Sequence, residues 1–267
     1  MTLQRLHHVL DSCAPAAIAL SGGVDSMTLG FIAHRRLPGR VAMFHAASAA
    51  VPQAATERIK AYAARENWSL NVVDAGELTD ERYLANPANR CFFCKSNLYG
   101  TLASLTADQL LSGTNLDDLG DWRPGLQAAR EHHVRHPFVE AEIDKNGVRA
   151  LAASLGLDDL AELPAAPCLS SRIETGQRID PKDLALIDRV ETLLRASCAA
   201  RTVRCRIRHD AMVIELDPAD ALGATARQQL ANRIRSMMHE RKPVRFESYR
   251  RGSAFLRHTL DNPDAVP

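Results

Sequence analysis

The sequence predicts an α/β fold, in which a doubly wound parallel sheet is followed by a smaller C-terminal α+β domain. Two observations predict the first part. Short apolar runs alternate with stretches of helical periodicity, and the first run ends in a glycine-rich turn that opens a helix. A strand of period two that begins near residue 203 predicts the second part. A chain of 267 residues is long enough for one large domain or two smaller ones.

The first domain is expected to span residues 1–180, with elements placed by periodicity and turn residues. In chain order they are a helix at 2–12, strands at 16–20 and 41–45, a helix at 53–67, strands at 69–73 and 110–113, and a helix at 145–155. Strands that alternate with helices indicate a parallel sheet. Ligands of such sheets bind beyond the carboxyl ends of the strands, where the turn at 21–26 and the loop at 113–115 are both expected.

The second domain is expected to begin at a boundary near 178–182. A substrate-binding and oligomerisation domain would then occupy residues 181–258, followed by a loose tail at 259–267. Its expected elements are a helix at 182–200, strands at 203–208 and 212–216, a helix at 219–240 and a strand at 244–247. From residue 182 onward the chain carries 16 Lys and Arg against 11 Asp and Glu, so this domain is the better place for an anionic substrate.

The overall composition excludes several classes of protein. An apolar fraction of 46% supports a well-buried core, while a net charge of +1 argues against a broad basic surface for nucleic acid. No apolar run approaches the roughly 20 residues that a membrane span needs, and the N-terminus lacks a signal-peptide core, so we expect a cytoplasmic protein. Six cysteines are too few for a disulfide scaffold, and any clustered ones indicate metal or redox chemistry.

The turn after the first strand has the features of an anion site. Gly22 and Gly23 let backbone N–H groups approach a ligand closely, and the helix start adds unsatisfied N–H groups. Ser21 and Ser26 can donate hydroxyl hydrogens, and Asp25 can hold a cation that accompanies phosphate. The alternative is a simple helix cap. The turn is neither a P-loop, which needs Gly-Lys-Ser/Thr, nor a dinucleotide motif; it resembles the PP-loop of ATP pyrophosphatases.

Two cysteines three residues apart form the second signal. Cys91 and Cys94 can bind one metal, as in zinc and iron–sulfur sites. The alternative is a thioredoxin-like redox pair, which is disfavoured because the motif does not open a helix after the first strand. Cys168 is a third candidate, because a proline-rich loop is an unusual place for a core cysteine. We interpret the remaining three as structural: Cys13, Cys198 and Cys205. Three thiolates can hold a cubane cluster whose fourth iron stays open.

Several motifs in fixed order make the chain similar to the LarE family, over about residues 14–255. Besides the PP-loop these are Asn89–Lys95 around the cysteine pair, Gly113–Asp118, Asp121–Gly125, Pro164–Arg172 and Tyr249–Ser253. Members of this family are ATP-dependent sulfur transferases that help to make the nickel-pincer nucleotide cofactor of lactate racemase. The resemblance implies a PP-loop fold of the adenine nucleotide α-hydrolase type.

The resemblance also implies a substrate and a reaction. The substrate would be pyridinium-3,5-biscarboxylic acid mononucleotide. ATP would adenylate one of its carboxylates at the PP-loop, with Mg²⁺ near Asp25, and sulfur would then displace AMP to give a thiocarboxylate. One type of family member sacrifices the cysteine at the position of Cys168. The other holds a [4Fe-4S] cluster on three cysteines, and Cys91, Cys94 and Cys168 match this type.

Roles for other residues follow from the same resemblance. Arg206 and Arg208 match the family's site for the substrate phosphate, and Arg250 lies in its late motif; guanidinium groups suit a phosphate. The alternative for this strand is a solvated edge with outward charges. Gly113 and Arg123 are expected to line the nucleotide cleft together with the turn residues.

Weaker candidates carry alternatives of their own. Asp117 and Asp118 are also expected at the nucleotide cleft, but helix capping would explain them equally well. Lys95 would either stabilise charge near the cluster or lie on the surface, and the family alignment alone places Glu191 near the substrate.

Three other functions remain as alternatives: a tRNA thiolase, an amide-forming synthetase of the PP-loop type, and a nucleotide-binding regulator with a structural metal. Near-neutral charge and the lack of a recognisable RNA-binding domain count against the tRNA thiolase. The expected cofactors are ATP, Mg²⁺ and a [4Fe-4S] cluster. The expected partners are a small nucleotide substrate, a sulfide donor protein and further copies of the chain, without nucleic acid or membrane.

Overall fold

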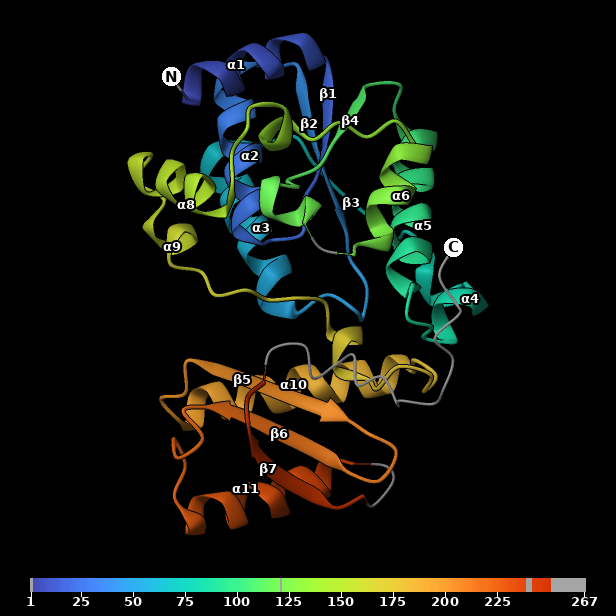
Figure 1. The fold of residues 1–267 in the computed structure, drawn as a ribbon, viewed down its shortest axis with the longest axis vertical. Coiled ribbons are helices and arrows are strands. Elements are labelled where there is room, and N and C mark those ends of the chain that lie inside the picture. The colour runs from blue at the N-terminus through green and yellow to red at the C-terminus, as the bar shows by residue number, and fades with distance from the viewer. Residues whose placement is uncertain (1, 121, 239–241, 251–267) are drawn as a thin grey trace. The chain divides into compact units, whose positions relative to one another are not determined.

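A computed structural model describes residues 2–120, 122–238 and 242–250 of the chain (Figure 1). The chain divides into two compact units, the first formed by residues 1–84 and 89–168 and the second by 85–88 and 169–267. The main division therefore falls after Cys168, some ten residues before the boundary expected at 178–182. The tail expected at 259–267 lies outside the described residues.

The first unit is built on a four-stranded sheet in which all strands are parallel, as the sequence predicts. The strands are β1 (Ala16–Ala19), β2 (Val41–Ala46), β3 (Leu70–Val73) and β4 (Gln109–Leu111). Their order is β3-β2-β1-β4, and Ala17 lies opposite Ala42 on one side and Leu110 on the other. The strand order reverses at β1, so the crevice beyond the carboxyl ends of β1 and β4 is the expected ligand position of such a sheet.

Helices cover both faces of this sheet (Figure 1). They are α1 (Thr2–Cys13), α2 (Val24–Arg36), α3 (Gln53–Glu66), η1 (Glu77–Thr79), α4 (Glu81–Leu84), α5 (Arg90–Leu105), η2 (Leu116–Leu119), α6 (Pro124–Glu131), α7 (Pro137–Glu140), α8 (Lys145–Ser154) and α9 (Asp158–Ala161). Strand side chains alternate between the faces: Ile18 joins the core under α1, α2 and α8, while Ala17 joins the core under α5 and α6. Two faces covered by helices confirm the doubly wound arrangement.

The second unit contains a three-stranded mixed sheet. Its elements are η3 (Leu169–Arg172), α10 (Pro181–Ser197), β5 (Thr202–Ile207), β6 (Met212–Asp217), α11 (Ala224–Met237) and β7 (Val244–Ser248). The strand order is β5-β6-β7, with β5 antiparallel and β7 parallel to β6. Helix α11 begins five residues later than expected, because Gly223 takes the N-cap position and Pro218 belongs to the preceding loop.

Strand β5 lies at the edge of its sheet, yet it is not the solvated edge that was the alternative for its arginines. Arg204 is 9% exposed and Arg206 5% exposed. The free edge of β5 is covered by the segment around η3, since Ile173 pairs with Ile207 and the Glu174 N–H donates to the Ile207 carbonyl. The alternating pattern was therefore correct, but its polar face is buried.

A buried ion pair holds α10 against β5 and η3. The Arg172 Nε donates to Glu191 Oε1 at 2.9 Å and its Nη2 to Oε2 at 3.2 Å, with both side chains 1% exposed. The Cys205 N–H donates to the same carboxylate, as does the partly exposed Arg195. Burial alone raises the pKa of Glu191, but these hydrogen bonds and charges outweigh it and lower the pKa.

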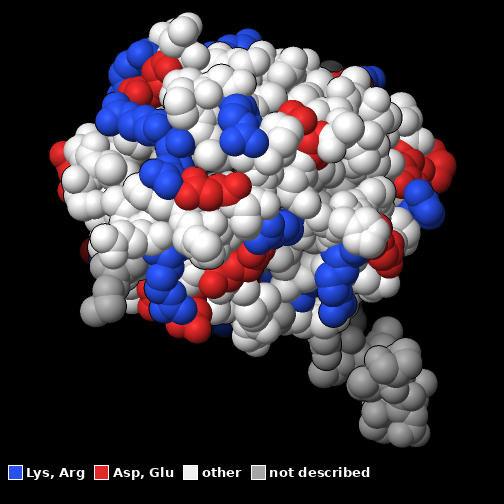
Figure 2. All heavy atoms as spheres, turned by 90° about the horizontal axis from the view of Figure 1, so that it is seen from above, with Lys and Arg blue, Asp and Glu red and all other residues white. Residues whose placement is uncertain are grey.

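Surface charges of both signs are interspersed. In the space-filling view, blue basic groups are interrupted by red acidic ones across the face shown (Figure 2). Several are paired, including Arg36 with Asp11 at 2.6 Å and Arg135 with Glu140 at 2.5 Å. Among the described residues, no helix combines the length and the apolar character that crossing a membrane requires.

We expect Glu191→Leu to lower the free energy of unfolding by about 3–5 kcal/mol, because it removes the carboxylate to which the buried Arg172 donates two hydrogen bonds. The double variant Arg172→Met/Glu191→Leu should recover most of that loss, since both charges are then removed. Urea unfolding followed by circular dichroism measures both. Arg195→Gln, which removes only a half-exposed partner, is the control and should cost less than about 1 kcal/mol. A Glu191→Leu variant as stable as the parent would contradict this account.

Candidate functional site

The turn after β1 requires glycine at one position for two reasons. Gly22 has φ +75°, a conformation that other residues rarely adopt, and an added Cβ would lie 2.9 Å from the Cβ and carbonyl oxygen of Ala55 on α3. Arg58, one turn further along α3, donates to the Gly22 carbonyl at 2.8 Å. Helix α3 thus fixes the path of the turn by contact with its backbone.

Helix α2 begins at this turn without a side-chain cap. Gly23 is the N-cap residue and carries no side chain, so a simple side-chain cap, the alternative to an anion site, is not formed. The hydroxyls of Ser21 and Ser26 instead lie 3.1 Å from each other, and Ser26 also accepts from the Ser21 N–H and donates to the Gly23 carbonyl. An uncapped helix start combines free N–H groups with the positive end of the helix dipole.

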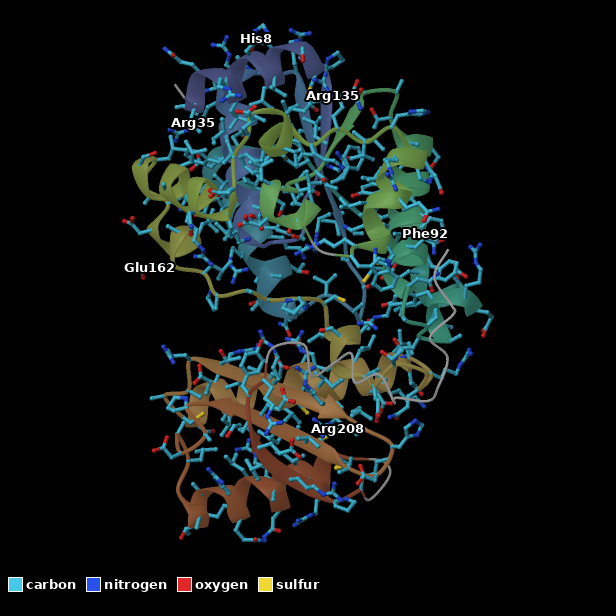
Figure 3. All side chains as sticks on the ribbon, in the orientation of Figure 1. His8, Arg35, Phe92, Arg135, Glu162 and Arg208 are labelled. Atoms are coloured by element: carbon cyan, nitrogen blue, oxygen red, sulfur yellow. The ribbon has the colours of Figure 1, made fainter. Side chains whose placement is uncertain are left out.

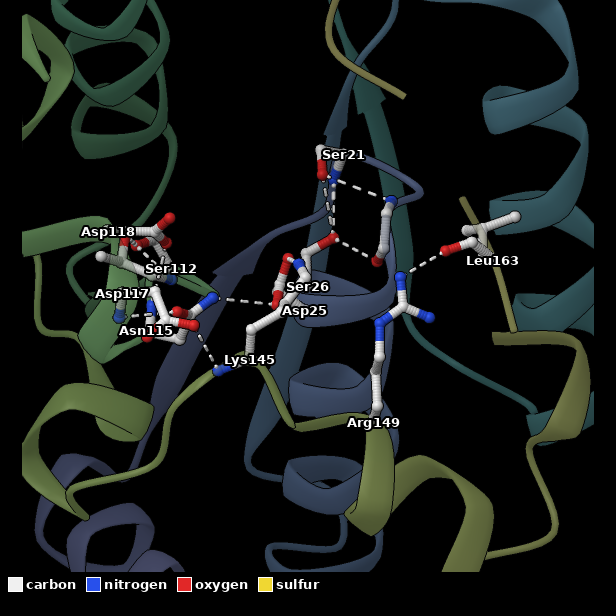
Figure 4. A network of polar contacts seen from close by, with 12 residues as sticks. Ser21, Asp25, Ser26, Ser112, Asn115, Asp117, Asp118, Lys145, Arg149 and Leu163 are labelled. Carbon is white, nitrogen blue, oxygen red and sulfur yellow. Dashed lines mark hydrogen bonds and ion pairs between the residues drawn. The ribbon is translucent and has the colours of Figure 1, made fainter. Parts of the chain in front are cut away.

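The carboxylate of Asp25, in the first turn of α2, is held by two donors (Figure 4). Lys145 Nζ lies 2.5 Å from Asp25 Oδ2, and Asn115 Nδ2 donates to Oδ1 at 3.1 Å. Asn115 follows β4, and Lys145 opens α8. The loop after β4 can approach this closely because residue 113 is glycine: a Cβ there would lie 2.6 Å from the Ser26 nitrogen. Gly113 is therefore required for backbone contact.

The segment after β4 is rigidly organised around Asn115. Its side-chain oxygen accepts from the Asp117 N–H, and its backbone N–H donates to Asp118, which together form a capping box for η2. Capping, the alternative to a place at the nucleotide cleft, therefore accounts for the side chain of Asp118. Asp117 also accepts from the backbone N–H of Lys145 at 3.1 Å, which fixes the start of α8 beside this loop.

Sequence reasoning placed Lys145 at a helix start and gave it no functional role. The residue lies 120 positions from Asp25, and neither periodicity nor a local motif signals a contact over that separation. Arg58 was missed for the same reason, because its only sequence signature is a position in an amphipathic helix. What brings both residues to the turn is the packing of α3 and α8 around α2.

The three candidate thiols lie in the same compact unit as the turn. Cys91 and Cys94 are in the first turns of α5, and Cys168 lies on the exposed loop that ends the unit. The charge of Cys168 acts on both thiols of the pair. Loss of hydration, followed by the charge of Cys168, raises the pKa of Cys91. Burial raises the pKa of Cys94 to about 12.

These thiols bear on both interpretations of the cysteine pair. The pair opens a helix that the sequence did not reveal, but that helix follows α4 and not the first strand, in agreement with the expectation. Raised pKa values are the opposite of what a redox-active thiolate needs, so they disfavour the thioredoxin-like alternative. Within the described ranges, however, no three His, Cys, Asp or Glu side chains are arranged so that they could hold a metal ion.

The side chains around Cys91 and Cys94 anchor the helix and add positive charge. Phe92 lies on α5 (Figure 3), where it packs against the core shared by α5 and α6. Lys95 Nζ lies 5.5 Å from the centre of the Tyr99 ring, and its pKa is raised by Tyr99 and by the nearby thiols. Lys95 is therefore half-buried beside the cysteines, which favours its expected role over a surface position.

Arg123 connects the two parts of the site. Its guanidinium lies 2.8 Å from Asp118, in the capping box that positions Asn115 on Asp25. Its charge also reaches Cys91 and favours the thiolate there. Hydrogen bonds and an ion pair therefore link the Asp25 carboxylate to Arg123, and the charge of Arg123 acts on Cys91.

In the second unit, the arginines of β5 are engaged with buried acids. Arg206 Nε lies 2.8 Å from Glu215, and its Nη1 donates to the Ser171 carbonyl. Arg208, labelled in Figure 3, is 20% exposed and contacts Glu215 and Glu247 at 3.4 and 3.5 Å. Burial and the charge of nearby arginines lower the pKa of Arg204, a further member of the cluster, to about 10. Arg250 is exposed.

Comparison with known proteins relates most of the chain to three others, while no family model matches it. An uncharacterized protein of Synechocystis is 37% identical over 223 residues, 81% of each chain. An uncharacterized protein of Methanocaldococcus jannaschii is 24% identical over 87% of this chain and 90% of its own length.

A third relative has a named activity. The pyridinium-3,5-bisthiocarboxylic acid mononucleotide synthase of Lactiplantibacillus plantarum is 31% identical over 208 residues, which cover 76% of this chain and 74% of that protein. The chain therefore belongs to the family of pyridinium-3,5-bisthiocarboxylic acid mononucleotide synthases, the LarE-like family that its motifs indicate.

Proposed function

We propose that the protein is an ATP-dependent sulfur transferase, which adenylates a carboxylate of pyridinium-3,5-biscarboxylic acid mononucleotide and converts it to a thiocarboxylate for the nickel-pincer cofactor of lactate racemase. The observation that carries the proposal is the uncapped start of α2, with Asp25 in its first turn, in the same compact unit as the thiols of Cys91, Cys94 and Cys168. Family membership supports the substrate class, because the relative from L. plantarum is named for a bisthiocarboxylic mononucleotide.

The turn from Ser21 to Ser26 is assigned to the ATP phosphates. The N–H groups at the start of α2 and the two serine hydroxyls would donate to phosphate oxygens. Mg²⁺ would bind at Asp25, whose oxygens are of the kind that this ion prefers, and would offset phosphate charge. A carboxylate oxygen of the substrate then attacks the α-phosphorus, and the bond to the bridging oxygen breaks, so that pyrophosphate leaves and an acyl adenylate remains.

The thiols are assigned to the sulfur step. Cys91, Cys94 and Cys168 would hold a [4Fe-4S] cluster, which when bound would supply sulfide. Support comes from the chemistry of the donor set, since cysteine thiolates are the ligands that such clusters use. The three side chains would have to converge when the cluster binds, because they are not arranged around a single metal position in this structure. Attack of sulfide on the acyl carbon breaks its bond to the phosphate oxygen, so that AMP leaves and the thiocarboxylate keeps the sulfur. The alternative donor is Cys168 itself, which would lose its sulfur and become dehydroalanine.

The substrate phosphate is assigned to the arginine cluster of the second unit, at Arg206, Arg208 and Arg250. Among them, Arg208 is the better candidate for a direct contact, since its two ion pairs are long and its side chain is partly exposed. Arg206 is buried between Glu215 and Ser171, which suits a residue that holds its neighbours in place. Guanidinium groups bind phosphate by paired hydrogen bonds.

With ATP, Mg²⁺ and the pyridinium biscarboxylate mononucleotide, we expect the protein to release pyrophosphate only when the mononucleotide is present. Asp25→Asn should lower that rate on the order of 100-fold. The variant removes the carboxylate assigned to Mg²⁺, so the cation would no longer offset the charge of the phosphates. A coupled pyrophosphate assay measures both, and Asp220→Asn, at an exposed position of the second unit, is the matched control. Release that depends on tRNA instead of the mononucleotide would favour a tRNA thiolase and contradict the proposal.

Anaerobic reconstitution should load the protein with four irons and four sulfides, as the proposed cluster requires. Replacement of Cys91, Cys94 and Cys168 by Ala should abolish loading, whereas Cys198→Ala, at a partly buried cysteine of the second unit, should not. Iron and sulfide analysis makes the comparison. A triple variant that still binds the full complement would contradict the assignment, and loss of the mass of hydrogen sulfide from Cys168 after turnover would establish the sacrificial route instead.

Arg208→Gln should weaken binding of the mononucleotide about 10- to 100-fold, because a charge-assisted contact to phosphate is removed. Binding of ATP should not change, since the turn lies in the other unit. Isothermal titration calorimetry with each ligand tests both statements. Arg201→Gln, at an exposed arginine just before β5, is the control. An equal loss of affinity for both ligands would contradict the assignment of ATP to the first unit and of the substrate phosphate to the second.

A further inference from the structure

Lys145 has no part in the function assigned above, yet its ammonium group makes the shortest contact with the Asp25 carboxylate. We propose that Lys145 is a phosphate-binding residue that neutralises Asp25 in the nucleotide-free protein and transfers its ammonium group to the nucleotide when a divalent cation takes the carboxylate. The inference rests on the proposed function, since it presumes that a nucleoside triphosphate binds at the start of α2.

The two donors on Asp25 differ in their freedom to move. Asn115 is 1% exposed, and its amide is fixed because its oxygen accepts from the Asp117 N–H. Lys145 reaches the carboxylate through a flexible four-carbon chain, and its side chain is one-third exposed. If one donor has to leave, the physical constraints select Lys145, because moving Asn115 would also break the capping box of η2.

A bound cation requires that one donor leave. Mg²⁺ binds oxygen at about 2.0–2.1 Å and would repel an ammonium group on the same carboxylate. The Lys145 contact to Oδ2 and a cation on Asp25 therefore compete for one partner, while the neutral amide of Asn115 can keep its bond to Oδ1. Without nucleotide, the ammonium group of Lys145 neutralises the Asp25 carboxylate.

The displaced ammonium has two possible anionic partners. One is a phosphate at the start of α2, which lies beside Asp25 because that residue is in the first turn of the helix. The other is Asp117, whose carboxylate already accepts the backbone N–H of Lys145. A triphosphate carries more negative charge than one carboxylate and sits at the uncapped helix end, so it is the stronger attractor. Asp118 is already paired with Arg123.

Binding of ATP in the presence of EDTA tests the inference without catalysis. In the Asp25→Asn background the ammonium has no carboxylate to neutralise at this position, so its contact with phosphate can be measured alone. Adding Lys145→Met to Asp25→Asn should weaken metal-free ATP binding about 10- to 100-fold, the effect of losing one charge-assisted hydrogen bond. Lys145→Arg in the same background should retain most of the affinity, because it keeps a cationic donor. Equilibrium dialysis with ATP measures all three.

The outcomes separate the inference from the function beneath it. Equal ATP affinity of Asp25→Asn and Asp25→Asn/Lys145→Met would mean that Lys145 only neutralises Asp25 or moves to Asp117, and would overturn the inference alone. No ATP binding to the unmodified protein would overturn the proposed function and the inference together. Thermal unfolding of each variant identifies a loss of fold, and Lys145→Gln, which retains a polar side chain, replaces Lys145→Met if the latter does not fold.

Discussion

The ion pair between Asp25 and Lys145, with the supporting hydrogen bond from Asn115, is the interaction on which the candidate site depends. It joins three segments that are remote in sequence: the start of α2, the loop after β4 and the start of α8. Each of these segments lies beyond a strand or at a helix end that the parallel sheet brings to one edge. The sheet thus places the three segments at one edge, and the contacts of the Asp25 carboxylate hold them together.

Close backbone contact makes this arrangement possible. Gly22 allows the turn to pass against α3, and Gly113 allows the loop after β4 to touch the backbone of Ser26. Once that loop is in place, its capping box orients Asn115 toward Asp25 and leaves Asp118 to bind Arg123. The same residues that position the Asp25 carboxylate therefore place the positive charge of Arg123 where it acts on Cys91 of α5.

The second unit buries several charged groups, and each buried acid is paired with arginine. Glu191 and Glu215 are each 1% exposed and each meets at least one arginine. Such pairs contribute little net stability over apolar residues, but breaking one is costly, so they fix a single arrangement of α10, η3 and β5. Glu191, which the family alignment alone placed near the substrate, is accounted for by this structural role. Arg208 is the member of the arginine strand that keeps exposed surface.

The sequence by itself determined the local features of this protein. The parallel sheet, the glycine-rich turn at Ser21–Ser26 and the alternation along β5 all follow from patterns within a few residues, where sterics and side-chain period act directly. It did not reveal helix α5 under the cysteine pair, the burial of Arg204 and Arg206, or the contact between Lys145 and Asp25. Those features depend on residues up to 120 positions apart, and which charges meet is decided only when the helices pack.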